Sequence, residues 1–593
     1  MDLRASAATT RTWRAGQVEE ANGAGGGLAR ALDAAGTGAL VGLLGGGADA
    51  VELQDDDVGL RVERRENGLA LVRTTWPGGE SAEQMVPFEV AIEDAVEALH
   101  DGSRALHFRG GVAYEGLPTA AAECVLPPLL PESLGSAAFR EAHGVRQAYV
   151  AGAMAGGIAG KALVLAMGRA GMLGYFGAGG LPLEAVETAL GEIARESEGR
   201  PFGFNLLHNP AEPGVEARTV DLYLAHGVRD VDASAFMGLT PSVVRYRLSG
   251  IHERDGRIIV PNRLAAKVSR PEVAEPFMRP APVAMLAELV AQGALSEAQA
   301  RWARTVPVAA DITAEADSGG HTDRRPLSAL IPLFRRLADR VSVEQGYAER
   351  IRVGAAGGIG DPWSLAGALQ LGADYVMTGS VNQCTPEAAT SDTVKEMLAQ
   401  AGYADVTEGP APDMFEIGAQ VQVLARGTMY AQRAARLYDL YKGCESLAAI
   451  PEAERARVEK QIFLRPIDEV WAETEVYWRA RDPREVERAL REPRHQMALT
   501  FRWYLGMSSR WARVGETTRK RDYQVWCGPA MGLFNDWVRG SWLEPVSERG
   551  VVTLADVLMR GACAALRVQA ARTAGVRLPD GADRLLPSRP RPR

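Results

Sequence analysis

Cysteine is scarce in this sequence, and the few cysteines show no pairing pattern. The 593 residues contain only five of them: Cys124, Cys384, Cys444, Cys527 and Cys563. An odd number without a CxxC spacing argues against a disulfide framework and against a structural zinc site. No histidine–carboxylate spacing indicates any other metal site. We therefore expect a protein of a reducing compartment, the cytoplasm.

Long apolar runs and an excess of positive charge are also missing. The first residues lack the continuous apolar run of a signal peptide, and the most apolar stretch, 150–180, is interrupted by Lys161 and Arg169. With 66 Lys and Arg against 75 Asp and Glu, the formal net charge is −9. A mildly acidic chain has no general attraction for nucleic acid. The sequence predicts a soluble protein with neither a membrane nor a nucleic-acid partner.

Glycine, by contrast, is abundant and clustered. The chain has 64 glycines, while its hydrophobic content of 46% is ordinary and sufficient for a large core. Clustered glycine lets the backbone turn tightly or approach a ligand closely. The glycine clusters are therefore the first places to look for a binding site.

Composition divides the chain into three parts. Residues 1–135 are irregular with strand-like pieces, and they end at a proline-rich segment that reads as a boundary. We predict a separate N-terminal domain of unknown role there. Residues 136–400 alternate short apolar runs with helical patterns, and residues 401–593 read as a mainly helical C-terminal extension.

The alternation in the middle part predicts an α/β fold. Strands that alternate with helices indicate βαβ units and a parallel sheet. Seven or eight such units predict a (β/α)8 TIM barrel, with a doubly wound sheet as the alternative. The expected strands are 148–153, 171–176, 202–206, 228–234, 306–312, 351–355 and 375–378.

Two consecutive strand ends have the pattern of a phosphate site. The strand at 351–355 runs into Gly357 and Gly358, and the following helix opens at Asp361 with a proline next to it. The next strand ends in Thr-Gly-Ser at 378–380. Glycine turns at helix N-termini present free N–H groups to a phosphate, and the loops after strands 7 and 8 of a barrel commonly do so. A pair of tight turns without a ligand is the alternative.

Two earlier strand ends suit a flat ring. The segment 150–157 (VAGAMAGG) carries small residues that let the backbone approach such a ring, although simple helix–strand packing is an alternative explanation. Asn205 ends the strand at 202–206, where an amide can pair with the edge of a heterocycle. These segments predict the ring-binding part of a site.

His321 is the catalytic candidate. It ends a polar, glycine-bearing loop, DITAEADSGGHTD at 311–323. A histidine on the C-terminal face of a barrel can transfer a proton near neutral pH, because its unperturbed pKa is about 6.5. We expect Glu315, Asp317 or Asp323 to orient the imidazole or raise its basicity. A purely structural loop histidine is the alternative.

Five motifs in combination resemble those of the PfaD family. They are GAMAGG at 152–157, FGFNLLHNP at 202–210, EADSGGHTDRRP at 315–326, GAAGGIGDPW at 354–363 and YVMTGSVNQ at 375–383. The segment VWCGPAMGLFN at 525–535 is similar to the C-terminal extension of that family. The resemblance implies an FMN-dependent, trans-acting enoyl reductase of polyketide or polyunsaturated-fatty-acid synthases, related to the nitronate monooxygenases.

By position, the resemblance also implies roles for individual residues. His321 matches the proton-transferring histidine of the nitronate monooxygenases, whose motif reads EAGGH where this chain has EADSGGH. The implied FMN contacts are Ala153 and Met154 against the isoalloxazine, Asn205 at its polar edge, and Gly357, Gly358, Gly379 and Ser380 around the phosphate.

The implied reaction uses NAD(P)H as co-substrate and an acyl thioester on acyl carrier protein as substrate. Hydride passes from the flavin to the β-carbon of the α,β-unsaturated thioester, and a proton reaches the α-carbon from His321 or from water. Two alternatives remain open. One is nitronate monooxygenase activity, and the other is a non-catalytic flavoprotein that serves the synthase as an assembly component.

The stretch 236–300 is long for one connection in a barrel, and long active-site connections commonly form lids. We expect a lid-like insertion there whose basic residues dock the acidic carrier protein or its phosphopantetheine. A solvated face, in which these bases alternate with acids, is the alternative. The candidate docking residues are Arg245, Arg247, Arg263, Lys267, Arg324 and Arg325, together with Arg270 and Arg279.

Overall fold

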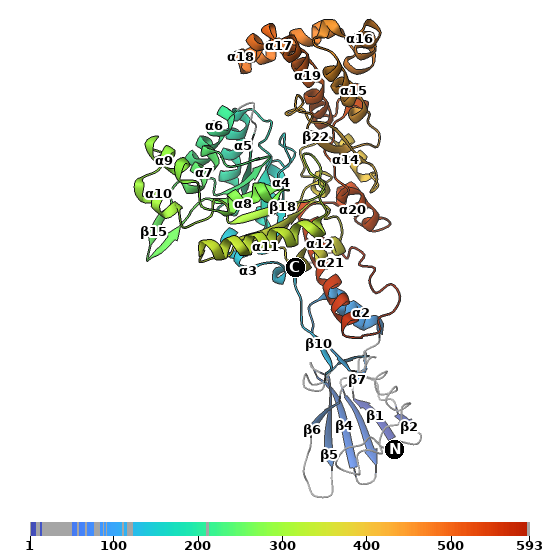
Figure 1. Cartoon of the computed structure of the whole chain (residues 1–593). Coiled ribbons are helices and arrows are strands. Elements are labelled where there is room, and N and C mark those ends of the chain that lie inside the picture. The colour runs from blue at the N-terminus through green and yellow to red at the C-terminus, as the bar shows by residue number, and fades with distance from the viewer. Residues whose placement is uncertain are drawn as a thin grey trace. The chain divides into compact units, whose positions relative to one another are not determined.

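The computed structural model describes residues 92–109, 112–115, 122–208 and 213–589, and before residue 92 it describes only strands. The chain forms two structural units (Figure 1). The first comprises Met1–Leu130 with Cys563–Leu585, and the second comprises Pro131–Ala562 with Leu586–Arg593. The boundary at residue 130 falls in the proline-rich segment, where successive prolines remove backbone donors.

The first unit contains two antiparallel sheets, in agreement with the predicted β-containing N-terminal segment. One sheet has the strand order β2-β1-β3-β4-β5-β6 and the other the order β10-β8-β9-β7. The buried guanidinium of Arg567 donates to the carbonyls of Pro127, Ala98 and Arg104. The elements are β1 (Asp2–Ser6), β2 (Thr12–Arg14), β3 (Ala50–Asp55), β4 (Val58–Arg65), β5 (Gly68–Thr75), β6 (Glu83–Val86), β7 (Phe88–Glu89), α2 (Ile92–Asp101), β8 (Leu106–Arg109), β9 (Val112–Glu115) and β10 (Cys124–Leu126).

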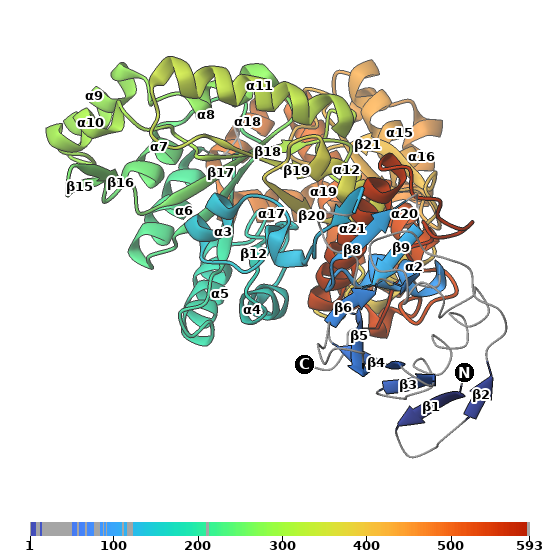
Figure 2. The ribbon, with the colours of Figure 1, turned by 90° about the horizontal axis from the view of Figure 1, so that it is seen from below.

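The second unit is built on a closed barrel of eight parallel strands, which confirms the predicted (β/α)8 fold. The last strand pairs with the first, Tyr149 lying opposite Val376. Parallel neighbours need helical crossovers, and Figure 2 shows helices around the barrel strands. The strands are β11 (Tyr149–Ala151), β12 (Leu173–Phe176), β13 (Gly203–Leu207), β14 (Asp230–Ser234), β17 (Arg263–Val268), β18 (Asp311–Glu315), β19 (Arg352–Ala356) and β20 (Tyr375–Thr378).

Helices surround the barrel strands, and several of them bury an apolar face. In α5, for example, Val186, Leu190 and Ile193 are buried at the spacing of a helical stripe. The helices are α3 (Ala137–His143), α4 (Lys161–Arg169), α5 (Leu183–Glu196), α6 (Pro213–Ala225), α7 (Pro241–Leu248), α8 (Pro271–Met278), α9 (Val283–Ala291), α10 (Glu297–Ala303), α11 (Leu327–Gln345), α12 (Pro362–Gln370) and α13 (Ser380–Gln383).

The predicted lid at 236–300 is wrong in its main part. The stretch contains the fifth barrel strand, β17, which pairs with β14 on one side and with β18 on the other. Only a short hairpin, β15 (His252–Arg254) with β16 (Arg257–Ile259), and the pair α9–α10 project from it. The strand was missed because Arg263 and Lys267 at its two ends made an apolar strand look like part of a charged loop.

A buried ion cluster closes the amino-terminal end of the barrel. His143 binds Asp230 through Nδ1 at 2.6 Å and Asp311 through Nε2 at 3.2 Å. Asp230 and Asp311 each also bind an arginine, Arg263 and Arg352 respectively, through both carboxylate oxygens. Because each buried charge has a partner of opposite sign, these charged side chains can fill the end of the barrel in place of apolar ones.

The C-terminal extension is helical apart from one hairpin, in agreement with the prediction. It stands beside the barrel strands in Figure 1 and packs around a core that includes Leu437, Phe501 and Tyr504. The helix α14 (Asp392–Ala399) precedes it. Its elements are β21 (Val406–Pro410), β22 (Gln420–Leu424), α15 (Tyr430–Gly443), α16 (Glu452–Val458), α17 (Ile467–Arg481), α18 (Pro483–Arg491), α19 (Pro493–Val514), α20 (Ala530–Val538) and α21 (Val551–Thr573), of which the residues from Cys563 onward belong to the first unit. Among the described helices, none has the length and apolar character needed to span a membrane.

Candidate active site

A cavity of about 900 Å³ opens at the carboxyl ends of the barrel strands. Its lining combines residues that follow the barrel strands with residues of the extension between Glu408 and Ala530. The carboxyl edge is where barrels of this type bind ligands. The predicted cofactor and catalytic residues all line this cavity: Ala153, Met154, Asn205, His321, Gly357, Gly358, Gly379 and Ser380.

His321 is paired with a carboxylate of the extension. Its Nε2 lies 3.1 Å from both carboxylate oxygens of Asp413. His321 comes from the loop between β18 and α11, and Asp413 from the turn between β21 and β22. About a third of each side chain is exposed, and both residues line the cavity.

The two partners shift each other's pKa. Burial lowers the pKa of His321, but the hydrogen bond and charge of Asp413, with the charge of Glu315, outweigh burial and raise the pKa above its ordinary value. For Asp413, burial raises the pKa, while the bond to His321 and its charge bring it below its ordinary value. The pairing therefore favours an imidazolium beside a carboxylate over a neutral imidazole.

The carboxylates that we expected to contact His321 have other partners. That prediction is wrong for direct contact, although the charge of Glu315 still acts on the imidazole. The observed bonds are Glu315 to Lys267 at 2.6 Å, Asp317 to Gln422 at 2.7 Å, and Asp323 to Arg270 at 2.7 and 2.8 Å. Asp413 was missed because no local pattern connects it with a residue 92 positions earlier.

The extension also fixes the loop that carries His321. The side chain of Gln422 donates to Asp317 and to the carbonyl of Ser318, and its backbone exchanges two hydrogen bonds with Gly320 at 2.8 and 3.0 Å. Asp317 and Ser318 are the two residues by which EADSGGH exceeds EAGGH. The longer loop is thus anchored by β22 rather than left free.

The same loop packs backbone to backbone against the segment at 527–530. A Cβ on Gly319 would lie 2.8 Å from the backbone nitrogen of Cys527, and a Cβ on Gly528 would lie 2.8 Å from that of Gly319. On the next loop, a Cβ on Gly360 would lie 2.2 Å from the carbonyl of Ala530. These three glycines let the extension lie directly against the barrel loops.

The glycine turns after β19 and β20 face the cavity. Gly357 has φ +86°, and a Cβ there would lie 2.8 Å from backbone atoms of Ala316 and Asp317. Gly358 also has a positive φ, and no atom lies within 4 Å of the position of its Cβ. Gly379 precedes the short helix α13, whose first residue, Ser380, accepts a hydrogen bond from Gly528. At Gly358 and Gly379, therefore, no other atom fills the position where a side chain would begin.

The strand ends that we expected to bind a ring are also at the cavity. Ala153 and Met154 follow β11, where the carbonyl of Met154 would lie 1.8 Å from a Cβ on Gly177. Asn205 is buried, and its Oδ1 accepts hydrogen bonds from the backbone N–H groups of Ala178 and Gly179. Its amide NH₂ is therefore the group left for a ligand.

The proposed docking arginines do not form one surface. Arg247 is buried and donates to the carbonyl of Asn262, so its assignment to docking is wrong. Arg263 lies at the start of β17, at the opposite end of the strand from the cavity, and is paired with Asp230. Lys267 and Arg324 do line the cavity. Arg245 pairs with Asp221 outside this lining.

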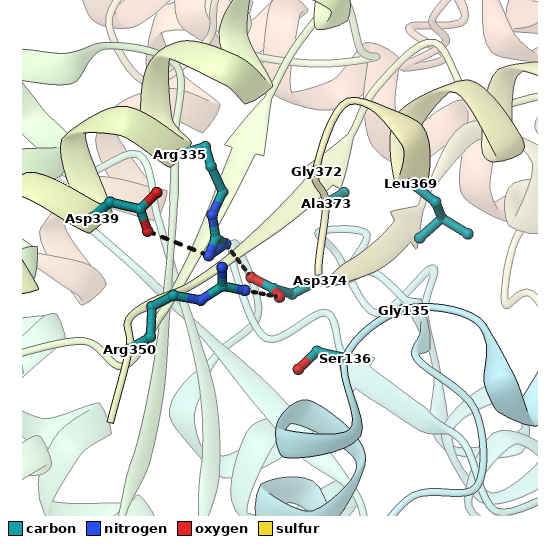
Figure 3. A pocket seen from close by; sticks show the side chains of 9 residues that line it. All are labelled: Gly135, Ser136, Arg335, Asp339, Arg350, Leu369, Gly372, Ala373 and Asp374. Carbon is teal, nitrogen blue, oxygen red and sulfur yellow. Dashed lines mark hydrogen bonds and ion pairs between the residues drawn. The ribbon is translucent and has the colours of Figure 1, made fainter. Parts of the chain in front are cut away.

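A second hollow, of about 610 Å³, lies at the amino end of β20 (Figure 3). Arg335 and Arg350 both reach the carboxylate of Asp374, at 2.5 and 2.7 Å. Arg335 also lies 3.6 Å from Asp339. Carboxylates neutralise both arginines. We therefore assign this hollow a structural role at the amino end of the barrel and not a ligand-binding role.

The matches to protein-family models follow this architecture. Residues 140–408 match the nitronate monooxygenase family, which covers the barrel. Residues 444–523, within the extension, match the inserted helical domain of [acyl-carrier-protein] S-malonyltransferase. The barrel is therefore similar to that of the nitronate monooxygenases.

Individual relatives narrow the class to a family. The chain is 38% identical to the enoyl reductase domain of MlnA from the macrolactin biosynthesis cluster of Bacillus amyloliquefaciens, with a TM-score of 0.71; the match covers 74% of this chain and 99% of that one. It is 46% identical over 440 residues to the polyketide biosynthesis protein ThaF of Burkholderia thailandensis, and 45% identical over 456 residues to a polyunsaturated fatty acid synthase polypeptide of Thraustochytrium sp.. The chain belongs to the PfaD-like family.

Those curated relatives are longer than the matched region. The match covers 74% of this chain but 38% of ThaF, and 76% of this chain but 30% of the Thraustochytrium polypeptide. The chain thus spans about a third of the length of these two relatives. Activity, substrates and partners of the present chain are therefore taken up as proposals.

Proposed function

We propose that the chain is a trans-acting, FMN-dependent enoyl reductase that uses NAD(P)H to saturate α,β-unsaturated acyl thioesters on acyl carrier protein, in polyketide or polyunsaturated-fatty-acid biosynthesis. The observation that carries the proposal is the His321–Asp413 pair beside a large cavity whose rim carries two glycine turns. The relatives in synthases and the likeness to an enoyl reductase domain support it.

The residues present fit FMN. A cavity of about 900 Å³ lies in the usual size range of cofactor sites. A Cβ at Gly357 would collide with backbone, and the turn has bare N–H groups of the kind that bind phosphate. Trp526, which also lines the cavity, has a buried indole N–H without a partner in the described part of the chain. The phosphate would be held by Gly357, Gly358, Gly379 and Ser380, and the ring by Ala153, Met154 and Asn205.

When bound, reduced FMN supplies hydride to the β-carbon of the substrate, and NAD(P)H restores the reduced flavin. The remaining requirement is a proton at the α-carbon. His321 can hold such a proton, because the hydrogen bond and charge of Asp413 raise the pKa of its imidazole. Since Nε2 is bound to Asp413, Nδ1 is the nitrogen that donates. Apolar lining residues such as Met377 and Phe236 exclude water from the reacting atoms.

The test is the absorption spectrum of the purified protein under anaerobic conditions. NADPH should bleach the flavin, and a carrier-bound crotonyl-type thioester should then restore the oxidised spectrum with formation of one equivalent of saturated product. A protein that takes up no FMN, or whose reduced flavin ignores the enoyl thioester, rejects the proposal.

Nitronate monooxygenase activity is the second candidate, favoured by the family match over 140–408. It would oxidise a nitronate with O₂ and would not need a nicotinamide. Bleaching of the flavin by a nitronate but not by NADPH would select it. If exchange of His321 for alanine and removal of flavin both left product saturation in the synthase unchanged, a non-catalytic role in the assembly would replace both activities.

A further inference from the structure

Basic side chains at the cavity are mostly neutralised. Apart from His321, four of them line it among the described residues: Lys267, Arg270, Arg324 and Arg513. Three have a carboxylate partner, at 2.6 Å for Lys267 with Glu315, 2.7 Å for Arg270 with Asp323, and 3.0 Å for Arg324 with Glu408. Arg513 is the exception.

Arg513 lies in the last turn of α19, and its guanidinium is held without a counter-charge. Nη1 donates to the carbonyl of Gly156 at 2.6 Å. Nε is buried and finds no hydrogen-bond acceptor in the described part of the chain, and the charge that acts on Arg513 there is that of another arginine. A guanidinium has five N–H donors in a fixed fork, so most of its donor capacity is unused.

The position of this guanidinium is fixed by the backbone of Gly156. A Cβ on Gly156 would lie 3.0 to 3.1 Å from Cζ, Nε and Nη1 of Arg513, so the absence of a side chain there lets the guanidinium lie close against this turn. Gly156 has φ +69°, and its N–H is bonded to the carbonyl of Gly179. The cation is thus held over the loops that follow β11 and β12.

An uncompensated cation in a partly buried site is costly unless something compensates it. Burial, together with the neighbouring charge of Arg510, lowers the pKa of Arg513 below its ordinary value. The guanidinium nevertheless stays charged, since Arg does not lose its proton in proteins. A bound anion would relieve this cost.

We propose that Arg513 binds the phosphate of the second ligand that enters the cavity, a phosphate ester distinct from FMN. The inference rests on the proposed function, in which the single phosphate of FMN occupies the turns after β19 and β20. Arg513 contacts the turn after β11 instead, so it is free for another anion. The planar guanidinium of Arg513 can donate two parallel hydrogen bonds to the oxygens of a phosphate.

Two reactants of the proposed function carry such a phosphate: the phosphopantetheine arm of the carrier-bound thioester and the nicotinamide dinucleotide. Steady-state kinetics of the FMN-loaded Arg513→Gln variant distinguish them. We expect the KM of one of the two to rise about tenfold or more, as for loss of a charge-assisted hydrogen bond. At saturating NADPH, turnover of a short phosphate-free N-acetylcysteamine thioester should be unchanged. The KM that rises identifies the source of the phosphate.

Binding gives a readout that does not depend on turnover. Free 4′-phosphopantetheine and NADP⁺ are titrated against the holoprotein, and one of them should bind about tenfold more weakly to Arg513→Gln. Arg510→Gln is the matched control, because this exposed arginine lies one turn earlier on α19. Arg513→Lys should restore part of the affinity, since it keeps the charge and loses the fork.

Three results overturn the inference. They are a loss of bound FMN in Arg513→Gln, unchanged affinity for both phosphate ligands, and, at saturating NADPH, equal losses for phosphate-bearing and phosphate-free thioesters. Failure of the proposed function is recognised separately, because the unaltered protein would then show no enoyl reduction at all.

Discussion

His321 and Asp413 are 92 positions apart in the chain, yet Nε2 of the histidine lies 3.1 Å from each carboxylate oxygen. One residue belongs to a barrel loop and the other to the C-terminal extension. The extension therefore completes the site chemically as well as covering it. The proton-donating capacity that we assign to His321 depends on a residue outside the barrel.

Exchange of Asp413 for asparagine removes the charge that raises the pKa of His321. The imidazole then loses its proton at lower pH, so the alkaline limb of kcat/KM should move to lower pH, with a loss of activity above it. The measurement is the pH profile of the FMN-loaded variant. Asp439→Asn, an exposed change on α15, is the control. An unshifted profile would refute the role of Asp413.

Exchange of Gly357 for alanine should abolish FMN binding. The residue has φ +86°, and its new Cβ would lie 2.8 Å from backbone of Ala316 and Asp317, which costs on the order of 1–3 kcal/mol. Flavin content after purification and reconstitution measures the effect. Gly367→Ala on α12 is the control, because no atom lies within 4 Å of its Cβ position. Equal flavin content in both variants would contradict the assignment of the phosphate turn.

Exchange of Gly528 for alanine tests the contact between extension and barrel loops. The added methyl group would lie 2.8 Å from the backbone nitrogen of Gly319 and would push away the loop that carries His321. Overpacking of this kind costs about 1–3 kcal/mol. We expect a lower midpoint of thermal unfolding and a several-fold lower turnover number. Gly443→Ala, which meets no atom within 4 Å, should change neither, and a normal turnover number in Gly528→Ala would refute the coupling.

The barrel should lose stability as pH rises from neutral into the alkaline range. Burial lowers the pKa of His143, but Asp311 and Asp230 outweigh it and raise the pKa to about 9, against about 6.5 in the unfolded chain. A raised pKa stabilises the fold fully below 6.5, and this contribution, on the order of 3 kcal/mol, is lost as pH passes through about 9. Calorimetric midpoints between pH 6 and 10 measure it.

The two acids that His143 faces are themselves paired with Arg263 and Arg352. His143→Gln should lower the midpoint at pH 6 and flatten its pH dependence. His252→Gln, at an exposed position of the β15–β16 hairpin, serves as control. A dependence that persists in His143→Gln would assign it to other groups.

Sequence patterns correctly predicted those features that depend on residues only a few positions apart. The helix start at Asp361 forms a capping box with Ser364, and the glycine turns follow their strands as expected. The fifth strand was missed because its charged ends, Arg263 and Lys267, are neutralised by Asp230 and Glu315 on neighbouring strands. Their partners become neighbours only when the barrel closes, so a linear pattern could not show that these charges are compatible with a strand.

The sequence by itself determined most of the barrel, the glycine turns and the loop that carries His321, because strand periodicity, positive-φ turns and loop residues depend on positions close together in the chain. Only the tertiary structure decided the partner of His321, the anchoring of its loop by Gln422 and the unpaired charge of Arg513 at the cavity. Each of these depends on the extension lying against the barrel loops. That contact joins segments a hundred or more residues apart through bare glycine backbone, and nothing in either segment alone specifies it.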